Sequence, residues 1–352
     1  MTTNRISIGT VCMNRLHHLK KTLTKNLLDN KDYDNVEFVI LDYNSSDGLE
    51  NWIKKELTSF LKSGVLKYYR HTENECFDRT HSRNMLFKLC SGDIICNVDA
   101  DNYTGKDFAK YVNDKFNEAE NIFLVADTNR QFYFLRNAFG RFCVKKSDYI
   151  KLRGLDEAMK SYGSETVDFY ERLKKNGNTE VIIEDTRFLD TISHGDEERI
   201  SNEFFLKNLE HLYIKHISIE ESELLFLYKD GSFGKNNLSS KTDDPFLPAS
   251  LIEGSLNKGK WSRQGNQLML LFDNGGSQSY TEENQTLKAP AENKMFYLVN
   301  DQRFLFEVAK NYSFINNYSK KESNSQNTNL INERSFGKGI AITVDEQELI
   351  IN

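Results

Sequence analysis

The stretch Ile94-Ile95-Cys96-Asn97-Val98-Asp99-Ala100-Asp101-Asn102 joins a short apolar run to two carboxylates one residue apart. The run is typical of a buried strand. In an extended backbone residues i and i+2 point to the same side, so we expect the side chains of Asp99 and Asp101 to converge. Two anions that close need a cation or a proton between them, and a hard divalent ion there can take a diphosphate. Taken alone, the four residues from Asp99 to Asn102 favour a plain polar turn.

Apolar runs that suit strands alternate with segments of helical spacing through the first 200 residues. The expected strands are 5–11, 36–41, 65–69, 94–98, 122–126, 139–144 and 181–183, and the expected helices are 16–28, 49–61, 82–89, 107–119 and 166–175. This alternation predicts an α/β fold with a mostly parallel sheet flanked by helices. Ligands of such sheets bind beyond the carboxyl ends of the strands, where Asp42, Asn44, Asp99 and Asp101 all fall.

The composition of the chain changes near residue 216. Short alternating runs follow, separated by turns, at 224–228, 268–272, 294–299, 304–308 and 339–344. They predict a small antiparallel β-domain, so we expect domains at 1–216 and 217–352. Residues 320–332, dense in Ser, Asn and Gln, suggest a mobile loop. Trp261, Phe296 and Tyr297 can stack on sugars, but we expect them in the core.

Composition narrows the class of protein. The 352 residues carry a net charge of -6, which argues weakly against binding to a nucleic acid backbone, although a local basic groove stays open. No stretch approaches the about 20 apolar residues that span a bilayer, and the N-terminus leaves no room for a signal peptide. These features predict a cytoplasmic protein, with peripheral membrane contact left open. The five cysteines form no C-x-x-C pair and are expected to be buried free thiols.

The order of the motifs resembles the GT-A glycosyltransferases, and family 2 in particular, a group related to bacterial capsule and glycan transferases and to galactosyl- and N-acetylgalactosaminyltransferases. The matching motifs, over about residues 5–200, are Asn14-Arg15, Leu41-Asp42-Tyr43-Asn44-Ser45-Ser46-Asp47-Gly48, Thr80-His81-Ser82-Arg83-Asn84, Ser91-Gly92-Asp93, Asp99-Ala100-Asp101-Asn102, Gly154-Leu155-Asp156-Glu157 and the segment from Glu165 to Leu173. The resemblance implies a GT-A (Rossmann-like) fold. It also implies transfer of a hexosyl or N-acetylhexosaminyl group from a UDP-sugar to a glycan or glycolipid hydroxyl, as in polysaccharide biosynthesis.

The resemblance also implies a donor-binding set. Its members are Thr10, Asn14, Arg15, Asp42, Asn44, Arg83 and Asp99. Asp42 would accept from the uracil imide with Asn44 nearby, and its alternative role is to cap the next turn. Arg83 would lie near the diphosphate, which suits a guanidinium fork, and its alternative is a salt bridge on the helix surface.

A divalent cation, Mn²⁺ or Mg²⁺, is the implied cofactor. Asp101 would coordinate the ion directly, and Asp99 would lie near the ribose or the metal. In several related branches a histidine after the last core strand completes the metal shell, in a pattern like His194…Arg199. Mn²⁺ accepts such mixed nitrogen and oxygen ligands, so His194 is the third predicted metal residue.

The chain departs from the family pattern at Glu165-Thr166-Val167-Asp168. Inverting family-2 enzymes usually carry Glu-Asp here, and that Asp deprotonates the acceptor hydroxyl. The matching position is Thr166, whose hydroxyl cannot act as a general base near neutral pH. We expect inversion with Glu165 as the base. The other carboxylates that can take this role are Asp168, Asp156 and Glu157.

Thr166 also keeps other functions open. Retaining relatives, the polypeptide N-acetylgalactosaminyltransferases, carry Glu-Asn at the equivalent place and need no enzymic base. A degenerate scaffold that binds a sugar or nucleotide without transfer is a second class. A third is glycosylation of modified bases in DNA, against which the negative net charge counts. The sequence leaves the role of the C-terminal β-domain and the oligomeric state undetermined.

Overall fold

The computed structural model describes residues 2–126, 137–239, 251–290, 292–326 and 331–352. The chain forms two compact units. The first comprises Met1–Gly195 and Asn317–Asn352, and the second comprises Asp196–Asn316. Within the described residues, no helix combines the length and the apolar character needed to cross a membrane.

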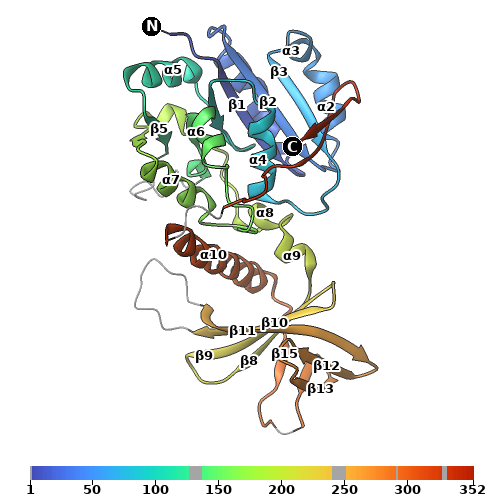
Figure 1. The fold of residues 1–352 in the computed structure, drawn as a ribbon. Helices are drawn as coiled ribbons and strands as arrows, with labels where there is room; N and C mark the ends of the chain where they lie inside the picture. The colour runs from blue at the N-terminus through green and yellow to red at the C-terminus, as the bar shows by residue number, and fades with distance from the viewer. Residues whose placement is uncertain (1, 127–136, 240–250, 291, 327–330) are drawn as a thin grey trace. The chain divides into compact units, whose positions relative to one another are not determined.

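A nine-stranded sheet forms the centre of the first unit (Figure 1). Its strands are β1 Ile6–Cys12, β2 Val36–Tyr43, β3 Leu66–His71, β4 Ile94–Asn97, β5 Ile122–Val125, β6 Phe142–Lys145, β7 Thr179–Ile182, β16 Gly339–Thr343 and β17 Glu348–Ile351, in the order β17-β16-β3-β2-β1-β4-β6-β5-β7. Strands β3, β2, β1 and β4 pair in parallel, whereas β6 runs antiparallel between β4 and β5. The predicted α/β fold with a mostly parallel sheet is confirmed.

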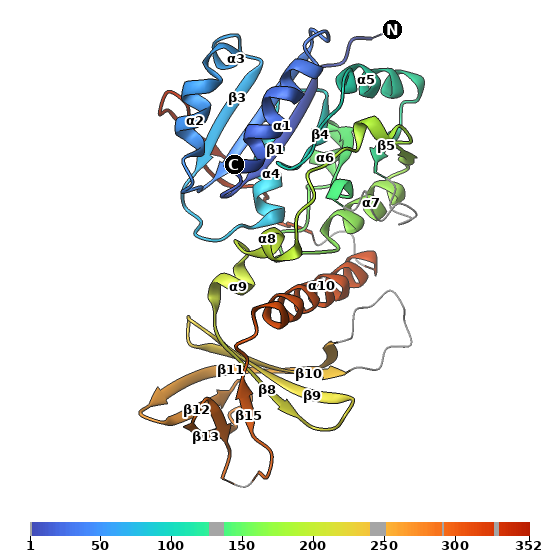
Figure 2. The ribbon, with the colours of Figure 1, turned by 180° about the vertical axis from the view of Figure 1, so that it is seen from behind.

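Helices cover both faces of this sheet (Figures 1 and 2). They are α1 Leu16–Asp29, α2 Leu49–Glu56, α3 Thr58–Lys62, α4 Arg79–Leu89, α5 Phe108–Glu118, α6 Lys146–Lys151, α7 Glu165–Lys175 and the short 3-10 helix Thr186–Phe188. Successive strand residues face opposite sides, so Ile40 packs in one core cluster with Leu19, and Leu41 packs in the other with Leu86. Double coverage explains the continuous apolar runs. All five cysteines are free thiols, and all but Cys76 are buried.

The C-terminal part of the chain differs from expectation. Residues 304–308, expected as a strand, lie in helix α10 (Gln302–Gln326). A run of five residues is too short to distinguish the period of a helix, about 3.6 residues, from the period of a strand, about two residues. The helix also includes 320–326, so the mobile loop expected there is wrong, and 327–330 lie outside the described residues. Strand β16 then pairs with β3, which returns the chain to the first unit. The units therefore divide after Gly195 and again before Asn317, not once at residue 216.

Eight antiparallel strands of the second unit close into a barrel. They are β8 Leu209–His216, β9 Glu221–Tyr228, β10 Ser232–Ser239, β11 Leu251–Gln264, β12 Gln267–Phe272, β13 Ser277–Glu283, β14 Thr286–Lys288 and β15 Phe296–Leu298, preceded by helices α8 Asp196–Ile200 and α9 Phe204–Asn208. The predicted antiparallel domain is confirmed. Phe296 is buried in its core and Trp261 packs against it, but Tyr297 points outward with 46% of its surface exposed.

Candidate active site

The loops after β1 and β2 are tied together at the carboxyl edge of the sheet. Asn14 adopts a left-handed conformation with φ 57, and its Oδ1 accepts a hydrogen bond from Ser46 N at 2.8 Å. Its own N–H donates to Ser45 Oγ at 2.9 Å, and Leu16 N donates to Asp47 Oδ2 at 2.8 Å. Because the two parallel strands are neighbours, their loops form one continuous wall that carries several of the predicted donor-binding residues.

Asp42 at the end of β2 is almost completely buried. Its Oδ1 accepts from Ser45 N at 2.8 Å and its Oδ2 from the Tyr68 hydroxyl at 2.7 Å. Burial raises the pKa of the Asp42 carboxyl, although the bonds from Tyr68 and Ser45 oppose this. The turn-capping contact is thus present, and Asn44 beside it donates from Nδ2 to Asn74 O at 3.0 Å.

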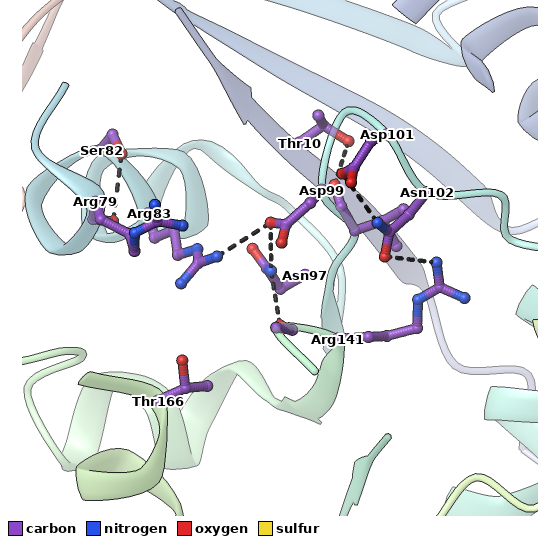
Figure 3. Close-up of polar contacts among 12 residues, drawn as sticks. Thr10, Arg79, Ser82, Arg83, Asn97, Asp99, Asp101, Asn102, Arg141 and Thr166 are labelled. Carbon is purple, nitrogen blue, oxygen red and sulfur yellow. Dashed lines mark hydrogen bonds and ion pairs between the residues drawn. The ribbon is translucent and has the colours of Figure 1, made fainter. Parts of the chain in front are cut away.

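Residues 99–102 form a turn, closed by Asn102 N donating to Asp99 O at 2.9 Å. The extended backbone expected for these residues, which would bring the two carboxylates together, is therefore wrong. In the turn, Asp99 and Asp101 have different hydrogen-bond partners (Figure 3). Asp99 Oδ1 accepts from Arg83 Nη2 at 3.0 Å and from Asn97 Nδ2 at 3.1 Å. Burial opposes its ionisation, but the charges of Arg83 and Arg79 outweigh this and hold the pKa of Asp99 below its usual range.

Asp101 is paired with His194, 93 residues further along the chain. Ile192 N donates to Asp101 O at 2.8 Å, and Asn102 forms an isolated bridge with Thr191, so the segment before His194 is held against the turn. His194 Nε2 lies 2.9 Å from Asp101 Oδ2, and the His18 ring packs 5.2 Å from the His194 ring.

The Asp101–His194 pair suits a divalent cation. Two neighbouring ligands on an octahedral ion at about 2.1 Å lie about 3 Å apart, close to the 2.9 Å between these two atoms. A carboxylate oxygen and an imidazole nitrogen are a donor set that Mn²⁺ accepts. Asp99 fits less well, because its Oδ1 is already held by a guanidinium.

Arg83 on α4 connects the turn to α7. The side chain is 1% exposed, so it is not the helix-surface salt bridge that was the alternative. Its Nη2 contacts Asp99, and its Nη1 donates to Glu165 Oε1 at 3.1 Å. Arg83 thereby holds two of the predicted site carboxylates, one at each terminal nitrogen of its guanidinium.

Glu165 is the first residue of α7. Its Oε2 accepts from Gly163 N at 3.2 Å, and its Oε1 lies 3.9 Å from Arg79 Nε as well as near Arg83. The Thr166 hydroxyl donates to Oε1 at 3.4 Å, so Thr166 supports Glu165 and does not replace it. Among the predicted bases, Glu165 is the one joined to Asp99 through a shared partner.

The other predicted bases are held in structural contacts. Asp168 Oδ2 lies 2.8 Å from both Nε and Nη2 of Arg172 on the same helix. Asn324 on α10 donates from Nδ2 to Asp168 Oδ1 at 3.0 Å and to Asp156 Oδ2 at 2.8 Å. Glu157 Oε1 accepts from Asn84 Nδ2 at 2.8 Å and from Gly337 N at 2.6 Å. These carboxylates hold together the segments around Glu165.

Two residues of the site, Gly140 and Arg141, are not indicated by any motif in the sequence. Gly140 O accepts from Asn97 Nδ2 at 2.8 Å, and a Cβ at Gly140 would lie 2.7 Å from Asp99 Oδ2. Arg141 Nη2 donates to Asn102 Oδ1 at 3.0 Å. Their only signal in the sequence is a Gly-Arg pair directly before an apolar run, which is not specific.

Residues 7–152 match the family model described as Glycosyl transferase family 2. This match covers less than half of the chain and agrees with the resemblance to family 2 that the motif order indicates. Among curated proteins, nothing matches the chain.

Several solved structures resemble part of the chain. The mannosyltransferase PcManGT from Pyrobaculum calidifontis, in complex with GDP-Man and Mn²⁺, is 20% identical with a TM-score of 0.43, over 52% of this chain and 55% of that one. S. aureus TarS 1-349 is 18% identical with a TM-score of 0.42, over 51% of this chain and 58% of that one. In complex with UDP-GlcNAc it is 17% identical with a TM-score of 0.41, over 54% and 59%. The similarity thus spans little more than half of these relatives.

Proposed function

We propose that this protein is a metal-dependent glycosyltransferase that moves a hexosyl or N-acetylhexosaminyl group from a UDP-sugar to a hydroxyl of a glycan or glycolipid. The observation that carries the proposal is the Asp101–His194 pair at the carboxyl edge of the sheet, with 2.9 Å between Oδ2 and Nε2. The family-2 match over residues 7–152, which include Asp101, supports it.

The charges of the site suit a diphosphate leaving group. Three carboxylates, Asp99, Asp101 and Glu165, are balanced by three guanidinium groups, Arg79, Arg83 and Arg141. When bound between Asp101 and His194, Mn²⁺ or Mg²⁺ would supply the excess positive charge that stabilises the departing diphosphate. The proposed binding surface for the nucleoside is then formed by the ends of β1 and β2, which carry Thr10 and Asp42, and by the loops after them, which carry Asn14, Arg15 and Asn44.

Glu165 is the proposed general base of an inverting reaction. Its carboxylate takes the proton from the acceptor hydroxyl while that oxygen bonds to the anomeric carbon, and the electron pair of the breaking bond leaves with UDP. Arg83, Gly163 and Thr166 hold the carboxylate in one orientation at the start of α7. A positioned base contributes more than a mobile one, because the orientation is fixed before the reaction.

A second candidate function is binding of a sugar or nucleotide without transfer. The observation in its favour is that the Arg83 guanidinium and the Gly163 N–H already occupy the two oxygens of Glu165. Incubating the protein with a panel of UDP-sugars, Mn²⁺ and candidate glycan acceptors separates the two. The transferase proposal predicts release of UDP from at least one donor, with an inverted anomeric proton in the product by NMR. Metal-dependent UDP binding without hydrolysis or transfer would favour the second candidate, and a product of retained configuration would remove the inverting mechanism.

A further inference from the structure

Arg141, directly before β6, is a completely buried arginine beside the Asp99–Asn102 turn (Figure 3). Burial lowers the pKa of its guanidinium to about 10, opposed by the nearby Cys143, Asp99 and Asp101, so the group stays charged at neutral pH. Its Nη2 donates to Asn102 Oδ1 at 3.0 Å. A buried cation is costly, so a specific role is expected of it.

The contact of Arg141 helps to fix which way the Asn102 amide faces, together with Asn137 O, which accepts from Asn102 Nδ2 at 3.2 Å. A guanidinium donates hydrogen bonds and accepts none, so the amide oxygen must face Arg141. The amide nitrogen then faces Asp101 and donates to its Oδ1 at 3.0 Å. A flipped amide would place its oxygen against the carboxylate, where two acceptors repel each other.

This orientation decides which oxygen of Asp101 is available. Oδ1 is occupied by Asn102, while Oδ2 lies 2.9 Å from His194 Nε2. The contacts therefore run in one chain from Arg141 through Asn102 to Asp101 and His194. The backbone of Asn102 is held as well, because Asn26 Nδ2 donates to Asn102 O at 3.0 Å. The side chain of Arg141 thus acts on a turn whose position is already set.

We propose that Arg141 is a positioning residue for the divalent cation: through Asn102 it directs Asp101 Oδ2 toward His194. The inference rests on the proposed function, in which Asp101 and His194 bind the ion. Two effects of Arg141 oppose each other, since its positive charge repels a cation while its contact with Asn102 orients a ligand. Outer partners of metal ligands typically change affinity by about 10- to 100-fold, so we expect orientation to prevail.

The test is the affinity for Mn²⁺ alone, measured by the electron paramagnetic resonance of the free ion, which needs no donor and no activity. We expect Arg141→Met and Asn102→Ala each to weaken binding by about 10- to 100-fold. Because the two substitutions remove the same contact, the double variant should bind Mn²⁺ only slightly more weakly than the weaker-binding single variant. Arg5→Met is the control. Arg5 pairs with Glu37 and directly precedes β1, so it lies at the amino end of that strand, whereas the site lies at the carboxyl end.

The outcomes separate this inference from the proposed function. Wild-type protein that binds no Mn²⁺ would refute the metal site itself. If the wild type binds Mn²⁺ and Arg141→Met binds it equally or more tightly, only the positioning role is refuted. The positioning role is also refuted if the losses of Mn²⁺ affinity in the two single variants add up in the double variant. If Arg141→Met does not fold, as judged by circular dichroism, Asn102→Ala decides alone, and unchanged Mn²⁺ affinity in that variant overturns the inference.

Discussion

At the scale of single residues, Thr166 and Glu165 determine whether the site can do chemistry. Thr166 occupies the place of the aspartate that family resemblance leads one to expect, and its hydroxyl donates to Glu165. Glu165 is in turn joined through Arg83 to Asp99. The proposed base and the turn proposed to bind the donor therefore share a single guanidinium.

Replacing Glu165 with Gln should lower the transfer rate by at least about 100-fold, because the amide cannot take the proton from the acceptor. The substitution keeps the size of the side chain, so UDP affinity in Mn²⁺ should stay near that of the wild type. Steady-state transfer and calorimetric titration with UDP measure the two. A fully active variant would mean that another group, or a retaining mechanism, carries the reaction.

Glu37 gives a prediction on stability at acidic pH. Its buried carboxylate accepts from Ser7 Oγ at 2.5 Å and Ser91 N at 2.6 Å and lies 2.7 Å from Lys67 Nζ. Burial raises the pKa of Glu37, but these partners outweigh it and lower the pKa to about 2. The unfolded chain, with a pKa of about 4.3 at this residue, binds the proton more readily.

The stabilisation from Glu37 is therefore complete above about pH 4.3 and is lost as the pH falls toward 2. Glu37→Gln should cost about 3 kcal/mol in the free energy of unfolding at pH 7, and should flatten its decline between these pH values. Urea unfolding at a series of pH values measures both. An unchanged slope in the variant would contradict the assignment.

At the scale of elements, the strand β2 was predictable because a strand covered on both faces leaves a nearly continuous apolar run. The apolar run at 304–308 was too short to show its period, and it lies in α10. The positions of Asp42, Asp99 and Asp101 at strand ends followed from the alternation of elements. The turn at Asp99–Asn102 agrees with the polar turn that these four residues favour by themselves. The place of Arg141 beside it did not follow from the sequence, because it depends on a contact between segments 39 residues apart.

The end of α10 gives a prediction at this scale. Asn324 is buried and donates to both Asp156 and Asp168, which are themselves 2% exposed. Asn324→Ala would leave two buried carboxylate oxygens without this donor, so it should cost about 1–3 kcal/mol in the free energy of unfolding. Asn300→Ala, at an exposed asparagine of the second unit, is the control. Equal stability of the two variants, by urea unfolding, would contradict the structural role of Asn324.

At the scale of the whole molecule, the first unit is built from two separate parts of the chain. Residues 317–352 supply the end of α10 and add β16 and β17 to the edge of the sheet next to β3. The change in composition near residue 216 is visible in the sequence, but the return of residues 317–352 to the first unit is not. The net charge of -6 is equally uninformative about the site, where buried arginines balance the carboxylates.

In the proposed site, Asp101 and His194 together bind a divalent cation that takes the diphosphate of the donor. The most direct measurement is the affinity for UDP by isothermal titration calorimetry, with Mn²⁺ and with EDTA, for the wild type, Asp101→Ala, His194→Ala and the control Asp185→Ala, at an aspartate that pairs with Arg187. We predict that Mn²⁺ strengthens UDP binding by the wild type and the control, and that both site variants lose this gain. Equal strengthening by Mn²⁺ in all four proteins would contradict the claim.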